Sequence, residues 1–493
     1  MRDAAVLPDL DAALLIVDVH YFDGEEDTYF VPLVRLPATA TRTRIADFPQ
    51  SHLAEVGDGE TGLFDATVNP AFCRWLLRVV REQSRVPLHL GTFIGRTGGS
   101  FPRQLDAGMG TLPVRRSSAE QSNTSVRFGD QAILKIFRRL QPGPNPDCEV
   151  VSYLAEERGN THVPAFLGSL HYASNAGEEF TLGMLQTLVA NQGDGWSWTL
   201  AALDRYYDAC VGRSFPSAWQ ALLAEPLLSL RREDLPGSVL DANADYLTAT
   251  ATLARRTAEM HLDLASATSR GAFQVRHLHH ADLAAMAQQL RRRALRIFER
   301  LEKCRSTLPD EVSGSAGFVL ARREQLAARF QELERLDATG KLARVHGDYH
   351  LGQVLRTGDD FVILDFEGEP ARPLSERRAR QSPLKDVAGM LRSFSYAADV
   401  AQANFRLARP SEAALAKGWA SLWATSVSTV FLGTYRAAVA GARLIPERDA
   451  DLGRLLEAFL LDKAFYELDY ELNNRPDWVR VPVRGIAQLV QAS

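Results

Sequence analysis

Short apolar stretches separated by polar turns run through the first third of the chain, a pattern that predicts β-strands. Residues 14–19 and 28–34 are two such stretches, and the acidic turn between them predicts a hairpin. Asn69 before Pro70 predicts a helix that begins at the proline, with the asparagine as its N-cap. We therefore expect a small α+β module over residues 1–98.

A second β-rich region is predicted over residues 99–189. Its clearest strands are residues 126–128 and 132–137, on either side of a glycine-containing turn. A helix is expected soon after them, because Asn145 can act as its N-cap and Pro146 suits its first position. The region is therefore expected to be a β-sheet unit with a helix inserted between its strands.

The rest of the chain, residues 190–493, is predicted to be mostly helical. Ala, Leu, Arg and Glu dominate residues 197–331, where apolar residues recur at helical spacing. Residues 341–367 break this pattern with a loop and short strands, and helices resume after them. This order predicts an α+β, two-lobed protein-kinase-like fold, with an N-terminal α+β cap module (1–98), a β-sheet N-lobe (99–189) and a helical C-lobe.

Charge and composition narrow the classes of function. A formal net charge of −5 over 493 residues gives no electrostatic reason to expect a nucleic-acid partner. No apolar segment approaches the ~20 residues needed to span a bilayer, so no membrane partner is expected. The four cysteines are far apart and form no CxxC pair, which suits a reducing compartment. We therefore expect a cytoplasmic protein.

The strongest chemical signal is the spacing of four polar residues in the loop-and-strand segment. His346, Asp348 and Gln353 match the pattern H-x-D-x-x-x-x-N of a kinase catalytic loop, with Gln in place of Asn. Asp365 follows an apolar strand, as the metal-binding Asp of that pattern does. The segment therefore predicts phosphoryl transfer from a nucleoside triphosphate to a small molecule.

Each of these residues has an expected role. Asp348 can orient the acceptor hydroxyl and accept its proton, an effect typically worth roughly 10²–10⁴-fold in rate. Asp365 and the amide of Gln353 offer the hard oxygen ligands that Mg²⁺ requires. We count His346 with the substrate-site residues, although we expect it to hold the loop backbone rather than touch the acceptor. ATP and Mg²⁺ are the expected cofactors.

Two residues of the β-rich region are expected to bind the nucleotide phosphates. Lys135 lies in the middle of an apolar strand, where kinases place a lysine that pairs with the α- and β-phosphates. Glu149, on the following helix, is expected to anchor it by an ion pair. The alternative is that Lys135 only protects an edge strand from pairing.

Two further segments are candidates for nucleotide contacts. No glycine-rich loop is present, but Ser122, Asn123 and Thr124 precede the strand of residues 126–128, and their backbone amides could cradle phosphates. A solvated turn is the alternative. The segment Met184–Leu188 ends the β-rich region and is the expected hinge for adenine, with Gln186 and Leu188 as contacts.

Other polar and aromatic residues have simpler interpretations. His261 lies in an apolar helical pattern and is expected to be packed and hydrogen-bonded. Aromatic residues recur along one later helix, where they suit either the core or a sugar site; they are Trp419, Trp423, Phe431 and Tyr435.

Several motifs resemble those of the bacterial maltokinases, relatives of the aminoglycoside-phosphotransferase branch of the protein-kinase-like fold. The C-terminal motif Tyr466–Trp478 is the most specific, because general kinase chemistry does not require it. The resemblance extends over about residues 14–486. The other matching motifs are residues 122–125, 193–196, 346–355, 365–370 and 382–393.

This resemblance implies ATP-dependent phosphorylation of maltose at the anomeric hydroxyl, giving maltose 1-phosphate for α-glucan synthesis. It implies sugar contacts from the C-terminal motif, for which Glu467, Tyr470, Glu471 and Arg475 are the candidates. It also implies association or fusion with trehalose synthase. The alternative for the motif is that its helix only packs the lobe.

Two other functions are compatible with the same residues. A kinase for another small acceptor, such as glucosamine or an aminoglycoside, would keep every catalytic residue and differ in the pocket of the helical lobe. A catalytically silent, kinase-like binding module is the second. Its biological activity would survive the substitution Asp348→Asn, whereas an enzyme would lose nearly all turnover.

Overall fold

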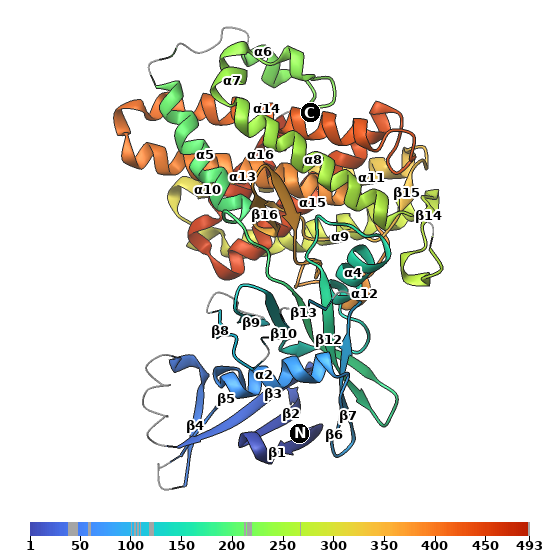
Figure 1. The fold of residues 1–493 in the computed structure, drawn as a ribbon. Helices are drawn as coiled ribbons and strands as arrows, with labels where there is room; N and C mark the ends of the chain where they lie inside the picture. The colour runs from blue at the N-terminus through green and yellow to red at the C-terminus, as the bar shows by residue number, and fades with distance from the viewer. Residues whose placement is uncertain are drawn as a thin grey trace. The chain divides into compact units, whose positions relative to one another are not determined.

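The computed structural model describes residues 1–37, 48–57, 61–99, 101–102, 105, 108, 110–117, 123–211, 213, 219–266 and 268–491 (Figure 1). The chain forms two units, residues 1–190 and 191–493. The first unit contains two antiparallel sheets, and the second is mainly helical.

The first sheet is built on the predicted N-terminal hairpin. Strands β2 (Ala12–His20) and β3 (Glu26–Pro37) pair antiparallel, which confirms that prediction. Every second residue of β3 from Thr28 to Val34 is buried, so one face of the strand packs into the core. The strand order is β1-β2-β3-β5-β4, and β11 also pairs with β3. The remaining strands are β1 (Asp3–Leu7), β4 (His52–Val56), β5 (Thr61–Asp65) and β11 (Arg139–Leu140).

The second sheet has the strand order β6-β7-β12-β13-β10-β9-β8. Its strands are β6 (Arg85–Pro87), β7 (Gly91–Thr97), β8 (Val114–Arg116), β9 (Asn123–Phe128), β10 (Ala132–Phe137), β12 (Phe166–Ser174) and β13 (Glu179–Thr187). The expected boundary at residues 98 and 99 falls between β7 and β8, two strands of this one sheet. The division into a cap and an N-lobe at that point therefore stays a prediction.

Two helices of the first unit begin where their caps predicted. Helix α2 (Pro70–Arg81) follows Asn69, whose side chain accepts a hydrogen bond from the amide of Ala71 at 2.9 Å. Helix α4 (Pro146–Ser152) follows Asn145, whose side chain accepts from the amides of Asp147 and Cys148. In both cases the side chain satisfies amides that have no partner inside the helix.

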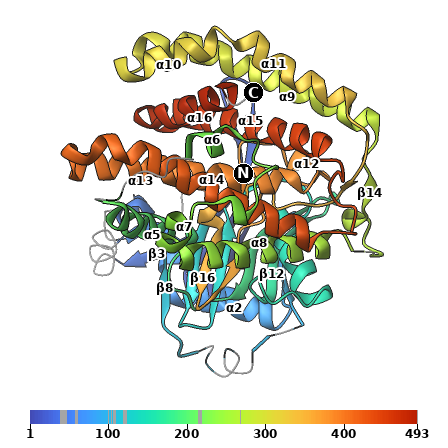
Figure 2. The same cartoon turned by 90° about the horizontal axis from the view of Figure 1, so that it is seen from above.

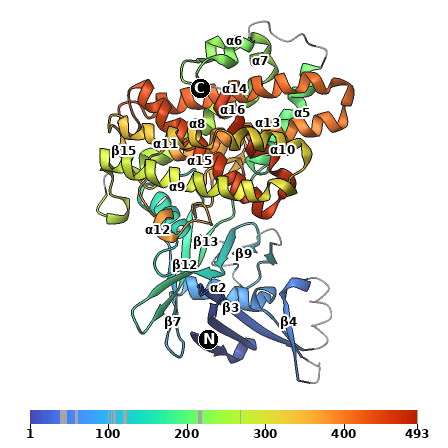
Figure 3. The same ribbon diagram turned by 180° about the vertical axis from the view of Figure 1, so that it is seen from behind.

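Long helices make up most of the second unit, as the 3.6-residue period predicted. Helix α13 lies beside α14 and α15, and α8 packs against α14 (Figure 2). Helix α15 also packs against α9 (Figure 3). The helices are α5 (Gly195–Cys210), α6 (Trp219–Ala224), α7 (Gly237–Ala242), α8 (Ala244–Leu264), α9 (His280–Cys304), α10 (Asp310–Leu320), α11 (Arg323–Gln331), α12 (Leu374–Arg377), α13 (Leu384–Ala408), α14 (Ala413–Ala438), α15 (Asp449–Asn474) and α16 (Arg480–Gln491).

The helical core is aromatic. Trp419, Trp423, Phe431 and Tyr435 of α14 are all buried, so the core interpretation of these residues is correct. Two short antiparallel strand pairs also belong to the unit: β14 (Arg276–His277) pairs with the distant β15 (Lys341–Leu342), and β16 (Val354–Thr357) forms a hairpin with β17 (Asp360–Ile363). Among the described residues, no helix is long and apolar enough to cross a membrane.

Helix α13 approaches the loop that precedes β16 very closely. A Cβ atom added at Gly389 would lie 2.5 Å from the carbonyl oxygen of Tyr349, a distance that real Cβ contacts do not reach. Glycine at this position therefore allows the helix to pack directly against the loop.

The substitution Gly389→Ala is expected to destabilise the second unit, because the added methyl must push the loop and helix apart, typically at a cost of about 1–3 kcal/mol. Gly433→Ala in α14 is the matched control, since a Cβ there meets nothing within 4 Å. It should stabilise the protein by up to ~1 kcal/mol through helix propensity. Chemical denaturation of both variants measures the difference, and equal stabilities would contradict the close approach.

Candidate active site

The predicted catalytic loop is held by a buried carboxylate of α13. Asp386 accepts hydrogen bonds from the amide of His346 at 2.7 Å and from that of Gly347 at 2.9 Å. His261 of α8 donates to the same carboxylate from Nε2 at 2.9 Å, and its Nδ1 lies 2.9 Å from the hydroxyl of Tyr435. His261 is thus packed and hydrogen-bonded, as expected.

The ring of His346 also serves the loop. Its Nε2 donates to the carbonyl of Leu364 at 2.8 Å, and the side chain is buried. This contact links the loop to the end of β17, which leads directly to Asp365. His346 does not line the pocket described below, so its position supports the backbone role rather than contact with an acceptor.

Gln353 and Asp365, the two predicted metal ligands, lie together. Nε2 of Gln353 donates to Oδ2 of Asp365 at 3.0 Å, which leaves the amide oxygen of Gln353 as a ligand atom. Asp365 has a φ of 65°, a left-handed conformation that a residue with a Cβ adopts at some cost. The donor set of one carboxylate and one amide oxygen suits Mg²⁺. These residues would hold the ion.

The carboxylate of Asp348 is paired with a lysine that the sequence analysis did not identify. Nζ of Lys463, on α15, lies 2.6 Å from Oδ1 of Asp348 and 3.3 Å from Oε1 of Glu369. Burial alone would raise the pKa of Asp348, but the charge of Lys463 and those of His350 and His346 outweigh it, so this pKa lies below its usual range. Asp348 is therefore ionised at neutral pH.

A cavity of about 680 Å³ opens beside Asp348, and one face of α15 forms part of its wall. The residues of that face recur every three or four positions, as one side of a helix does. Three of the predicted sugar-binding residues lie on it and the fourth, Arg475, directly follows the helix. The lining residues of α15 are Lys463, Tyr466, Glu467, Tyr470, Glu471 and Asn474.

The two glutamates of this cavity differ in what they can offer a ligand. Glu467 is paired with Arg392 at 2.6 Å. Oε1 of Glu471 accepts from the hydroxyl of Tyr396 at 2.9 Å and from Arg475 at 3.0 Å. Its Oε2 is buried without a hydrogen-bond partner among the described residues. Burial raises the pKa of Glu471. A ligand that donates a hydrogen bond to Oε2 would satisfy it.

Aromatic rings form much of the remaining wall. Tyr396 lies edge-on to Trp196, with ring centroids 5.9 Å apart, and parallel to Trp478, at 6.3 Å. Sugar rings present flat C–H faces and a rim of hydroxyl groups, so a wall of aromatic, carboxylate and amide groups is suited to them. The helix of the C-terminal motif thus lines a cavity on one face, and its role in sugar binding stays a prediction.

In the first unit, Lys135 lies on a central strand. Strand β10 pairs with β9 on one side and β13 on the other, which rules out the edge-strand alternative. Nζ of Lys135 lies 3.1 Å from Oδ2 of Asp147, in the first turn of α4. The structure thus places Asp147 at ion-pairing distance from Lys135. Glu149, which the sequence analysis named as the anchor, lies half-buried two residues later on the same helix, and its role stays a prediction.

The structure gives the positions of most of the other residues expected to contact the nucleotide, and their contact with a nucleotide stays a prediction. Asn123 and Thr124 belong to strand β9 rather than to a turn, and the buried hydroxyl of Thr124 accepts from Arg138 at 2.9 Å. Ser122 lies outside the described residues. Gln186 is in β13, and the amide of Leu188 donates to the carbonyl of Gln131 at 3.0 Å. That amide is therefore engaged within the unit.

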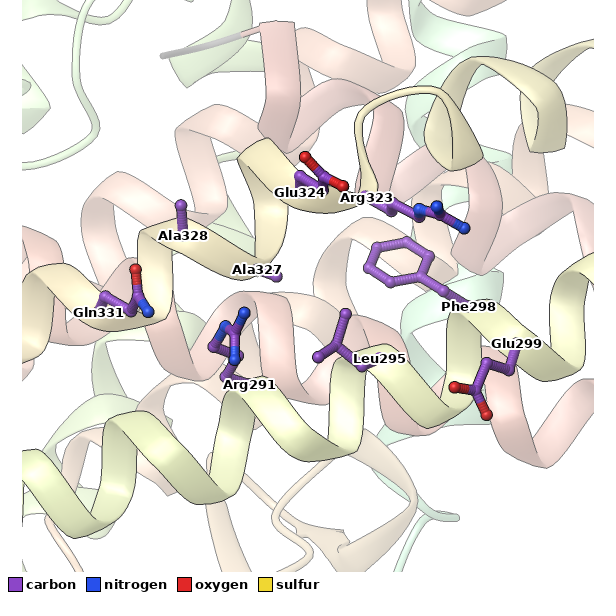
Figure 4. A pocket seen from close by; sticks show the side chains of 9 residues that line it. All are labelled: Arg291, Leu295, Phe298, Glu299, Arg323, Glu324, Ala327, Ala328 and Gln331. Atoms are coloured by element: carbon purple, nitrogen blue, oxygen red, sulfur yellow. The ribbon is translucent and has the colours of Figure 1, made fainter.

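A second cavity lies between α9 and α11 (Figure 4). It encloses about 440 Å³, and its walls combine apolar side chains with Arg291, Glu299 and Arg323. No residue of the catalytic loop or of α15 lines it. The cavity beside Asp348 is therefore the candidate active site.

The chain is similar to known proteins over most of its length. No family model matches the chain. The chain is similar to a glucosamine kinase of Streptacidiphilus jiangxiensis, with 27% identity over 482 residues, 93% of this chain and 96% of that protein. It is also similar to a glucosamine kinase of Mycolicibacterium smegmatis (strain ATCC 700084 / mc(2)155), with 29% identity over 381 residues, 76% of this chain and 79% of that protein.

Solved structures show the same likeness at the level of fold. A glucosamine kinase in complex with glucosamine, ADP and inorganic phosphate has a TM-score of 0.60 and 23% identity, over 99% of this chain and 93% of that one. Crystal form B of a glucosamine kinase gives the same TM-score, identity and coverage. The chain therefore has the predicted α+β, protein-kinase-like fold.

Proposed function

We propose that the protein transfers the γ-phosphoryl group of ATP to a hydroxyl group of a small sugar. The observation that carries this proposal is the position of Asp348, an ionised carboxylate on the wall of a cavity whose lining includes aromatic, carboxylate and amide groups. The similarity to glucosamine kinases over 93% of the chain supports the same reaction class.

In the proposed reaction the acceptor oxygen attacks the γ-phosphorus, and the bond from that phosphorus to the β–γ bridging oxygen breaks. ADP leaves, and the hydroxyl proton passes to Asp348. Because the pKa of Asp348 is low, its main contribution is to orient the hydroxyl, and proton transfer comes late in a loose transition state. Gln353 and Asp365 would hold Mg²⁺, which neutralises charge on the phosphate oxygens. Lys135 would pair with the α- and β-phosphates.

Glucosamine is the acceptor that the observations favour. Both curated relatives are named glucosamine kinase. An amino sugar carries an ammonium group, and the carboxylate of Glu471, a residue that lines the cavity, is an acceptor suited to it. This assignment replaces maltose as the first candidate, although the two remain testable in one assay.

Maltose is the second candidate, because a cavity of about 680 Å³ has room for a disaccharide. Phosphorylation at the anomeric hydroxyl, a place in α-glucan synthesis and association with trehalose synthase remain predictions of the maltokinase resemblance. An aminoglycoside acceptor has no specific observation in its favour.

An acceptor screen tests the proposal directly. The protein, ATP and magnesium are incubated with glucosamine, glucose, maltose and an aminoglycoside, and ADP release and the phosphorylated product are measured together. Turnover of glucosamine is expected to exceed that of glucose and maltose at equal concentrations. Preference for maltose would select the second candidate, and ADP release without any phosphorylated sugar would exclude sugar kinase activity.

Asp348→Asn is expected to lower kcat by roughly 10²–10⁴-fold, because the amide cannot accept the hydroxyl proton. Binding of ATP, measured by calorimetry, should be unchanged. Asp359→Asn is the matched control: this aspartate is fully exposed in the turn between β16 and β17. It should keep full activity. A near-normal kcat in Asp348→Asn would contradict the role of Asp348, whereas a wild-type protein without any turnover would support the silent-module alternative.

Glu471→Gln separates the two acceptors. The substitution keeps the size of the side chain and removes its charge, so it should raise KM for glucosamine by about 10-fold or more, given the ~1.5–3 kcal/mol of hydrogen bonds to charged groups. KM for maltose, a neutral sugar, should change less. Steady-state kinetics with both sugars on the same preparation gives the comparison, and equal changes would show that Glu471 does not recognise an ammonium.

A further inference from the structure

Lys463 is buried between two carboxylates at the inner end of the active-site cavity. Its Nζ lies 2.6 Å from Asp348 and 3.3 Å from Glu369, and the three side chains are between 2% and 16% exposed. Both carboxylates raise the pKa of Lys463 against the opposing effect of burial, so the ammonium stays charged. One cation is thus shared by the catalytic carboxylate and by a second carboxylate behind it.

Glu369 has other cations of its own. Arg372 bonds to Oε2 of Glu369, and Nζ of Lys385 lies 3.9 Å from the same oxygen. Glu369 therefore remains paired without Lys463, whereas the carboxylate of Asp348 has no second hydrogen-bonded cation among the described residues. Nε2 of His350 is 3.9 Å from Oδ2, beyond hydrogen-bonding distance, and burial lowers the pKa of this histidine, which favours its neutral form.

The two oxygens of Asp348 are consequently different. Oδ1 is occupied by Lys463, and Oδ2 accepts no hydrogen bond from a described residue. Stability alone does not explain this arrangement, because desolvation of a buried ion pair commonly offsets its Coulombic attraction. Lys463 also begins the face of α15 that lines the cavity, one turn before Tyr466 and Glu467. The same helix face therefore positions the catalytic carboxylate and forms the acceptor wall.

We propose that Lys463 is a positioning residue for Asp348: by binding Oδ1 it fixes the carboxylate so that Oδ2 is presented to the acceptor hydroxyl. This inference rests on the proposed function of Asp348. It assigns to α15 a part in the transfer step, in addition to its part in acceptor binding.

Lys463→Met is expected to lower kcat by about 10²-fold, the cost of a misplaced catalytic group, while the affinity for ATP stays unchanged. Lys463→Arg keeps a cation, so its kcat should be at least fivefold higher than that of Lys463→Met. Lys341→Met is the matched control, because this half-buried lysine donates to the carbonyl of Ala442, far from any site carboxylate. It should leave activity unchanged.

A double-mutant cycle distinguishes positioning from a general structural effect. If Lys463 acts through Asp348, Lys463→Met should lower the residual kcat of Asp348→Asn by less than about threefold. If the two substitutions lower kcat by factors that multiply, the inference is wrong. It is also wrong if Lys463→Met alone keeps a near-normal kcat. A wild-type protein that phosphorylates no acceptor would instead refute the proposed function.

Lys463→Met leaves two buried carboxylates without their shared cation, and it could lower stability. The double variant Glu369→Gln with Lys463→Met removes one charge of each sign, so its thermal unfolding temperature should return towards that of the wild type. Its kcat should nevertheless stay low. Recovery of both stability and kcat would show that Lys463 acts only through the fold, and the inference would be wrong.

Discussion

The carboxylate of Asp386 is the contact on which the active site depends. It is buried, accepts two backbone amides of the catalytic loop, and binds His261, so it joins α13, α8 and the loop at one point. Burial would raise the pKa of Asp386, but the hydrogen bond and charge of His261 and the loop amide lower it below its usual value. An ionised acceptor inside the core makes strong hydrogen bonds, and its removal would leave several buried donors unpaired.

The candidate metal ligands and the catalytic carboxylate of this loop have different surroundings. Gln353 and Asp365 hydrogen-bond to each other at the base of the β16–β17 hairpin, whereas Asp348 faces the cavity and is fixed by Lys463. Helix α15 supplies the charge that holds the base and, along the same face, the groups that would hold the acceptor. In the proposed mechanism, α15 therefore links the position of the catalytic carboxylate to the binding of the acceptor.

Local signals in the sequence predicted the structural features that depend on only a few neighbouring residues. The caps Asn69 and Asn145 marked two helix starts, and the spacing of the loop residues identified the site, because these features involve only a few consecutive positions. Contacts between distant segments were missed. Lys463 is 115 residues from Asp348, and Asp147 could not be told from Glu149 by pattern alone. Lys463 lies one helical turn before the recognised motif, so helical spacing could have pointed to it.

The central claim is that Oδ2 of Asp348 receives the acceptor hydroxyl while Lys463 holds Oδ1. A crystal structure with glucosamine and a non-hydrolysable ATP analogue measures this most directly. The account predicts one sugar hydroxyl oxygen within hydrogen-bonding distance, about 2.5–3.0 Å, of Oδ2, with the Lys463–Oδ1 contact intact. A sugar bound elsewhere, or a hydroxyl group bonded to Oδ1 in place of Lys463, would contradict it.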